Sequence, residues 1–155
     1  AKDISGLEIH IYGDGPDRSK ILNYIEKKKI NNVYIHGPFD YLNIGKIYSK
    51  TDVVWSVYPN TSNSNKKYVI PNKFFECLYF QTPGIFPRKT KIGDLIEQYD
   101  IGYTVDPYSI SAIKKLLLYI LNSSNINAKI YSLINSDISY LWDDDIKALG
   151  KLLEK

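Results

Sequence analysis

The sequence predicts an α/β protein in which one parallel, doubly wound sheet is covered by helices on both faces. Short apolar runs typical of strands alternate with longer segments whose apolar residues recur every three or four positions, as on a helix face. Repeated strand–helix units form parallel sheets, because right-handed crossovers bring each new strand beside an earlier one. With 155 residues, 44% hydrophobic and 24% charged, the chain has the size and composition of a single globular domain.

The first strand–helix unit contains a glycine-rich turn. We predict a strand from Leu7 to Tyr12, which ends at Gly13-Asp14-Gly15-Pro16. Asp17 is placed to cap the next helix, because an aspartate side chain accepts hydrogen bonds from the first free backbone N–H groups. The apolar face of this helix has residues at helical spacing, namely Ile21, Leu22 and Ile25.

The second unit begins with a strand from Val33 to Ile35 that is closed by His36-Gly37-Pro38. Asp40 is placed to cap the helix that follows. The apolar face of that helix comprises Ile44, Ile47 and Tyr48. A third strand is predicted over Asp52 to Tyr58, and we expect its central residues to be buried: Val53, Val54 and Trp55.

A helix preceded by a long polar loop follows the third strand. The loop runs from Pro59 to Lys67 and is the longest in the chain. Pro71 suits the first position of the helix, where its missing N–H costs no hydrogen bond. Glu76 lies off the apolar stripe of this helix, on the side shared with Asn72 and Lys73. The stripe comprises Phe74, Phe75, Leu78 and Tyr79.

The rest of the chain continues the alternation of strands and helices. Ser109 is placed to cap the longest helix. The apolar face of that helix comprises Ile113, Leu116, Leu117 and Ile120. The last helix is expected to start near Trp142, with Ile146, Leu149 and Leu153 on one face. The other expected elements are strands over Gly84 to Phe86 and Tyr103 to Val105, and helices near Gly93 to Tyr99 and Asn127 to Leu133.

Composition excludes several classes of protein. The formal charge is +3, and only Arg18 and Arg88 among the 20 basic residues are arginines, which is unlike a nucleic-acid reader with clustered arginines. Cys77 is the single cysteine, so no internal disulfide can form, which is compatible with a reducing cytosol. No apolar run approaches the roughly 20 residues of a membrane-spanning helix.

The predicted order of elements is that of a doubly wound, Rossmann-like sheet, which binds ligands at the carboxyl ends of its strands. The free N–H groups of the helix after Pro71 lie at the same rim and suit a phosphate. The segments that the topology brings to this rim are Gly13 to Pro16, His36-Gly37, Tyr58 to Pro71, Pro87 to Lys89, and Asp106.

The segment from Pro71 to Glu76 and the Gly13-Asp14-Gly15-Pro16 turn resemble motifs in the C-terminal half of GT-B glycosyltransferases, most closely the retaining family-four enzymes. The resemblance extends over roughly Leu7 to Leu153. It implies the nucleotide-sugar-binding domain of an enzyme that transfers a sugar without a bound metal or other cofactor, with a UDP-sugar or GDP-sugar as donor.

The resemblance implies a role for each residue of the predicted site. Glu76 would hold the ribose hydroxyls, because a carboxylate offers only acceptors to a diol. Lys73 would lie near the diphosphate or the sugar, and the His36-Gly37 loop would approach the base. Tyr68 stands where the family has a second glutamate, eight positions before Glu76. The predicted site is Gly13, Gly15, His36, Gly37, Tyr68, Asn72, Lys73 and Glu76, with no catalytic residue identified.

Several of these features have simpler interpretations. Lys73 and Glu76 can form a surface ion pair of the helix, and the glycine turn can serve only to join a strand to a helix. The side chain of His36 can be a hydrogen-bonded residue without a ligand. Asp143, Asp144 and Asp145 are interpreted as complements of a helix dipole rather than as metal ligands, and Cys77 as a packed residue rather than a nucleophile.

The resemblance further implies what the whole enzyme does. The chain is interpreted as a fragment without the acceptor-binding domain and without the first strand–helix unit, so that it binds a donor weakly and does not catalyse transfer. The acceptor would be a saccharide or lipid-linked, in bacterial surface polysaccharide synthesis. A cytoplasmic location is implied, with peripheral association of the full enzyme at the inner membrane face left open. The face around Trp142 is expected to remain apolar and uncovered.

Two other functions remain open at this stage. A nucleotide-sugar 2-epimerase shares the fold and would need acid–base groups at the rim, where His36 is the available histidine. A non-catalytic module of the flavodoxin or receiver type would need an acidic cluster after the first strand, where only Asp14 is found.

Overall fold

The computed structural model describes residues 2–58, 68–123 and 125–136. The strands are β1 (Ile9–Tyr12), β2 (Val33–Gly37), β3 (Val54–Trp55), β4 (Gly84–Pro87) and β5 (Gly102–Val105). The helices are α1 (Arg18–Lys27), the 3-10 helix η1 (Tyr41–Asn43), α2 (Ile44–Tyr48), α3 (Asn72–Phe80), α4 (Lys91–Tyr99), α5 (Ile110–Asn122) and α6 (Asn125–Ile134). The polar loop 59–67 and the helix expected near Trp142, including Asp143 to Asp145, lie outside the described residues.

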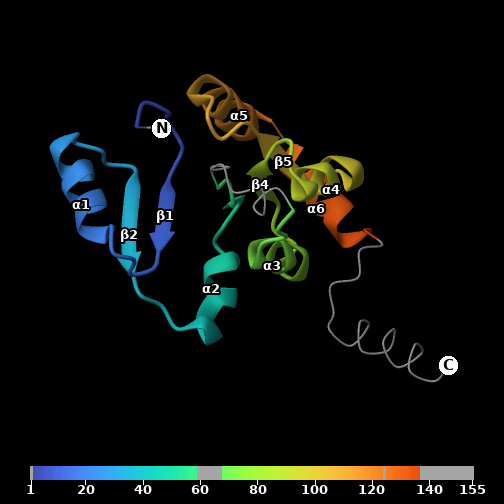
Figure 1. Ribbon diagram of the computed structural model, residues 1–155, viewed down its shortest axis with the longest axis horizontal. Helices are drawn as coiled ribbons and strands as arrows, with labels where there is room; N and C mark the ends of the chain where they lie inside the picture. Colours follow the sequence, from blue (N-terminus) through green and yellow to red (C-terminus); the bar gives the residue numbers. More distant parts are fainter. Residues whose placement is uncertain (1, 59–67, 124, 137–155) are drawn as a thin grey trace.

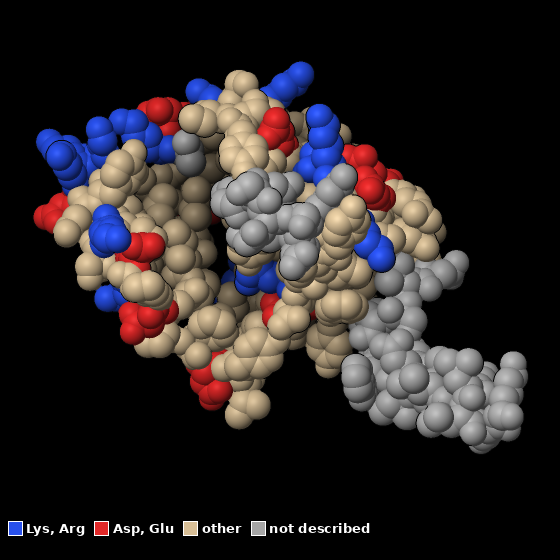
Figure 2. All heavy atoms as spheres, viewed as in Figure 1, with Lys and Arg blue, Asp and Glu red and all other residues tan. Residues whose placement is uncertain are grey.

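The strands are parallel, as predicted, and the α/β class is confirmed. They form two sheets, β1–β2 and β3–β4–β5. Ile9 pairs with Val33 in the first sheet, and Ile85 pairs with Tyr103 in the second. Figure 1 shows β1 on the side of its sheet that faces β4 and β5. The space-filling view in Figure 2 is hollowed between the atoms of the first sheet and those of the second.

The hydrophobic core lies on the two faces of the β3–β4–β5 sheet. Phe86 and Ile85 are neighbours on β4, and their side chains enter different core clusters because successive strand residues point to opposite faces. One cluster comprises Phe74, Cys77, Leu78, Phe86, Ile92, Ile96, Ile101 and Leu133. The other comprises Val57, Ile85, Tyr103, Val105 and Ile120, with the predicted apolar face of α5 packed on it. Close approach of the strands requires Gly102, since a Cβ there would lie 2.6 Å from the Gly84 carbonyl oxygen.

The unit formed by β1, α1 and β2 is covered much less. Helix α1 contains no buried residue, and its predicted apolar face is exposed to solvent at Ile21, which is 39% accessible. Ile11 on β1 is also exposed. The amphipathic pattern of α1 is therefore present, but no element of the described part of the chain buries these residues.

Trp55 corrects one prediction about burial. The expected strand from Asp52 to Tyr58 shortens to β3, and Val53 and Val54 are half-buried. Trp55 is 45% exposed instead of buried. In the sheet of the described residues, β3 pairs with β4 alone, so nothing adjoins its other edge to cover the indole.

Helix α3 differs from its prediction in two ways. It begins at Asn72, with Pro71 as the residue that caps it rather than its first residue. Cys77 is buried with Phe74 and Leu78, whereas Phe75 and Tyr79 are exposed. The helix packs through positions separated by three and four residues, and the rotation that buries Cys77 turns Phe75 and Tyr79 outward.

The predicted helix caps have mixed outcomes. Asp40 accepts a hydrogen bond from the backbone N–H of Leu42, and Ser109 accepts one from that of Ala112, so both predictions are confirmed. The prediction for Asp17 is wrong, because its side chain makes no capping bond and instead accepts from Lys20 Nζ at 2.7 Å. Among the described helices, none has the length and apolar character needed to cross a membrane.

Candidate functional site

Glu76 lies on α3 with a hydrogen-bond donor on each carboxylate oxygen. The hydroxyl of Tyr41 donates to Oε1 at 3.0 Å, and the hydroxyl of Tyr48 donates to Oε2 at 2.7 Å. The carboxylate is half-buried. Glu76 is therefore held in a polar setting where η1, α2 and α3 meet, rather than among apolar side chains.

The two phenols remain protonated donors at neutral pH. Burial, and then the hydrogen bond to Glu76, raise the pKa of Tyr48 far above its ordinary value. The hydrogen bond to Glu76 is the main cause that raises the pKa of Tyr41. Since each proton is kept on oxygen, each phenol can donate to the carboxylate.

The start of α3 leaves its first backbone N–H groups without a side-chain cap, because Pro71 occupies the capping position. Asn72 is exposed and Lys73 is half-buried in the first turn. The alternative that Lys73 and Glu76 form an ion pair is not observed, since the ion pairs between described residues involve neither of them. This helix terminus thus presents N–H groups and a lysine near the carboxylate.

The glycine turn and the His36-Gly37 loop are joined directly. The backbone N–H of Gly13 donates to the Gly37 carbonyl oxygen at 2.6 Å. Both residues have positive φ, at 135° for Gly13 and 76° for Gly37, which a residue with a Cβ adopts only with strain. A Cβ at Gly13 or Gly15 would have no atom of the described residues within 4 Å beyond the adjoining chain, so these residues leave the outer side of the turn open.

Arg18 is a positively charged residue close to Gly37 that was not included in the site predicted from the sequence. A Cβ on Gly37 would lie 3.7 Å from its guanidinium. Its Nε is buried without a hydrogen-bond acceptor among the described residues and lies 3.6 Å from Asp14 Oδ1. The available signal was a basic residue in the first turn of a helix, where the helix dipole favours an acid.

The ring of His36 is already engaged by its neighbours. Its Nε2 lies 2.8 Å from Nδ1 of His10, and its ring stacks on Tyr12 with centroids 4.3 Å apart. The side chain therefore matches the interpretation of a hydrogen-bonded residue on the sheet surface. Its backbone neighbour Gly37, rather than the imidazole, lies at the loop that meets Gly13.

Two other predicted features can be placed. Tyr68 is exposed and lies just before α3, while its preceding neighbours Asn65, Lys66 and Lys67 fall outside the described residues. Cys77 is in the core, and burial raises the pKa of its thiol to about 12. A thiol that stays protonated is a poor nucleophile, which confirms its interpretation as a packed residue.

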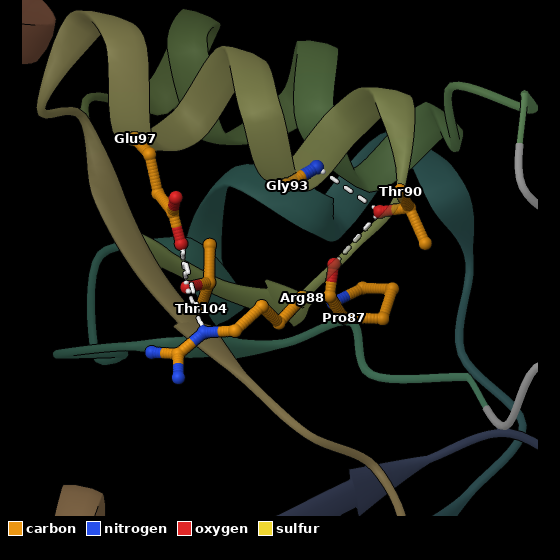
Figure 3. A network of polar contacts seen from close by, with 6 residues as sticks. All are labelled: Pro87, Arg88, Thr90, Gly93, Glu97 and Thr104. Atoms are coloured by element: carbon orange, nitrogen blue, oxygen red, sulfur yellow. Dashed lines mark hydrogen bonds and ion pairs between the residues drawn. The ribbon is translucent and has the colours of Figure 1, made fainter.

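The end of β4 is fixed to α4 by a polar network (Figure 3). The buried Thr90 hydroxyl donates to the Pro87 carbonyl oxygen at 2.7 Å and accepts from the Gly93 N–H at 3.1 Å. Arg88 Nε donates to the Thr104 hydroxyl at 3.3 Å, which in turn donates to Glu97. The network fixes the backbone at this part of the rim. Over the described residues, no cluster of three or more potential ligands forms a metal site.

Tyr41 and Tyr48 are the contacts of Glu76 that sequence reasoning missed. Tyr48 was assigned to an apolar helix face, which it does occupy through its ring, and Tyr41 carried no periodic signal. Their hydroxyls reach Glu76 only because α2 packs beside α3, where Tyr48 stacks on Phe80 with centroids 4.5 Å apart. No local pattern encodes that contact between separate helices.

Comparisons with known proteins identify the family of this chain and, separately, a solved structure with a similar fold. The family described as "Glycosyl transferases group 1" matches residues 1–132. The crystal structure of TarM is similar, with a TM-score of 0.67 and 22% sequence identity over 99% of this chain, which spans 29% of the length of TarM. A search of curated proteins found no match. The family match covers most of the sequence, and the chain belongs to the group 1 glycosyl transferases.

Proposed function

We propose that this chain is the donor-binding half of a glycosyltransferase that moves a sugar from a nucleoside-diphosphate sugar to a saccharide or lipid-linked acceptor. The observation that carries the proposal is Glu76, a half-buried carboxylate oriented by two phenols beside the uncapped start of α3. Family membership supports glycosyl transfer in general terms. The donor, the acceptor and a role in surface polysaccharide synthesis belong to the proposal.

Each part of the donor is assigned to a different set of residues. Glu76 accepts hydrogen bonds from the ribose hydroxyls. Lys73, the N–H groups that open α3, and Arg18 supply positive charge for a diphosphate. The same groups would stabilise the charge that develops on the leaving nucleoside diphosphate. Retention of configuration and independence from metal follow from the family resemblance and are part of the proposal.

The full enzyme is proposed to contain more than these 155 residues. Among the described residues, β1 and β3 are each unpaired along one edge, and Ile11 and Trp55 on these strands are exposed. A further parallel strand between β1 and β3 would pair both edges and join the two sheets. The acceptor would bind to a second domain, and the full enzyme associates with a membrane surface peripherally if its acceptor is lipid-linked.

Nucleotide binding tests the central observation. We expect UDP or GDP, alone or as sugar conjugates, to raise the melting temperature of this chain by mass action. Glu76→Ala should weaken that binding by about 1.5–3 kcal/mol, the contribution of hydrogen bonds to a charged group. Glu26→Ala, which removes an exposed acid from α1, is the matched control. Equal losses in the two variants, or no response to UDP, GDP, ADP and their sugars, would contradict the proposal.

An activity assay tests whether the chain is sufficient. The isolated chain should bind a donor without transferring sugar to an acceptor, because one domain supplies only one side of the reacting bond. Robust transfer would show that no second domain is needed.

The geometry gives no support to a 2-epimerase. His36 is the histidine available there for acid–base chemistry, and its ring is stacked on Tyr12 and hydrogen-bonded to His10.

A further inference from the structure

The two phenols that hold Glu76 differ in how firmly they are fixed. Tyr48 is 7% exposed, and its ring stacks on Phe80. Tyr41 is 60% exposed and lies on the three-residue helix η1. One carboxylate oxygen therefore contacts a buried side chain that is packed on another ring, and the other contacts a side chain that is mostly in solvent.

The cost of breaking each hydrogen bond differs for the same reason. If Tyr48 left Oε2, its hydroxyl would lose a partner inside the protein, and a buried unpaired donor is costly. If Tyr41 left Oε1, its hydroxyl would be free to bond to water. The exchange of Tyr41 for another donor is the easier of the two.

A ribose carries two adjacent hydroxyls that can donate to a carboxylate, as a phenol does. We propose that Tyr48 is a positioning residue that fixes Glu76 through Oε2, and that Tyr41 occupies Oε1 until a ribose hydroxyl of the bound nucleoside diphosphate displaces it. This inference rests on the proposed function. It adds that, without a ligand, the Tyr41 hydroxyl occupies the carboxylate oxygen that a ribose hydroxyl would use, so that Tyr41 competes with the ligand.

The two roles predict opposite effects of removing a hydroxyl. Tyr41→Phe should tighten the binding of UDP or GDP roughly two- to tenfold, because no phenol has to be displaced. Tyr48→Phe should weaken binding by about tenfold, because Glu76 loses the bond that fixes it. The gain in Tyr41→Phe should vanish for 2′,3′-dideoxy UDP or GDP, which has no ribose hydroxyl to compete with the phenol.

Two further variants control for general effects of the substitution. Tyr131→Phe changes an exposed tyrosine on α6 and matches Tyr41. Tyr103→Phe changes a buried tyrosine on β5 and matches Tyr48, and its hydroxyl has no hydrogen-bond partner among the described residues. Neither variant should alter nucleotide affinity, measured by isothermal titration calorimetry. Melting curves show whether Tyr48→Phe is folded, and the Tyr41 comparison does not depend on it.

The outcomes separate this inference from the function on which it rests. Weaker binding in Tyr41→Phe, or an equal gain with the dideoxy nucleotide, would overturn displacement while Glu76→Ala still supported ribose binding. No loss of affinity in Glu76→Ala would overturn both. Tighter binding in Tyr41→Phe that requires the ribose hydroxyls would establish that Tyr41 is displaced.

Discussion

The unit of β3, β4 and β5 and the unit of β1, α1 and β2 have the same local design but differ in burial. In the first, Phe86 and Ile96 are almost inaccessible to solvent, with helices on both faces of the sheet. In the second, the sheet has two strands among the described residues, and α1 has no buried residue. The comparison shows that an amphipathic pattern prepares a core, but only a second layer of structure completes it.

Glu76 lies where the two units are connected. The carboxylate lies on α3, a helix of the well-packed unit, and contacts η1 and α2, which connect that unit to the poorly covered one. Both phenols come from this connection: the buried Tyr48 lies on α2, and the largely exposed Tyr41 lies on η1. In the candidate site, the carboxylate is therefore bonded to one buried and one exposed donor.

The largest difference in stability between the two units is expected when one isoleucine on a helix of each unit is replaced by alanine. Ile96→Ala on α4 should lower the free energy of unfolding by about 2–5 kcal/mol, because it leaves a cavity in a closed core. Ile21→Ala on α1 should cost about 1 kcal/mol or less, because that side chain is already part-exposed. Chemical denaturation at two protein concentrations measures both. Equal losses would show that the first unit is covered in solution, and a concentration dependence would identify a second copy as the cover.

Glycines test the same contrast through the backbone. Gly102→Ala should destabilise the protein by about 1–3 kcal/mol, since the new methyl group would overlap the Gly84 carbonyl oxygen and force the strands apart. Gly15→Ala would place a methyl group with no atom of the structurally described residues within 4 Å, and it should change stability by about 0.5 kcal/mol or less. A cost at Gly15 as large as that at Gly102 would mean that the glycine turn is packed against something in solution.

Substitutions at the N-termini of α4 and α1 should change the free energy of unfolding by a smaller amount. Thr90→Ala should cost about 1–2 kcal/mol, because the buried hydroxyl caps α4 and also bonds to Pro87. Asp17→Ala should cost about 0.5 kcal/mol or less, because it removes only the exposed pair with Lys20. Urea titration of both variants compares them. A larger loss at Asp17 would show that it caps α1 in solution despite its observed orientation.

Alkaline pH should weaken the well-packed unit by the smallest amount. Burial raises the pKa of Cys77 from 9.0 to about 12, so the unfolded chain loses this proton at lower pH than the folded protein does. Stability is therefore intact below pH 9 and falls as pH rises from 9 towards 12, by about 1 kcal/mol at pH 10. Melting temperatures at pH 8 and pH 10 measure the fall, which should shrink in Cys77→Ala. A pH-independent melting temperature up to pH 10 would contradict the burial of the thiol.

Part of the geometry of the candidate site could be predicted from the sequence, because two of its loops follow parallel strands. Gly13 and Gly37 end consecutive parallel strands, and parallel strands bring their carboxyl ends to one edge, where the two loops are indeed hydrogen-bonded. The side of α3 that carries Glu76 was also predictable from helical spacing. The partners Tyr41 and Tyr48 were not, because a contact between separate helices depends on how those helices pack.

The sequence by itself determined the alternation of parallel strands and helices, the caps at Asp40 and Ser109, and the exclusion of Glu76 from the apolar stripe. These are local properties, since side chains repeat their direction every two residues in a strand and every 3.6 in a helix. The tertiary structure alone decided that Phe75 and Tyr79 are exposed on α3, that Trp55 is exposed, and that two phenols hold the carboxylate. Burial and hydrogen-bond partners depend on which distant elements meet, and that information lies in no single stretch of the chain.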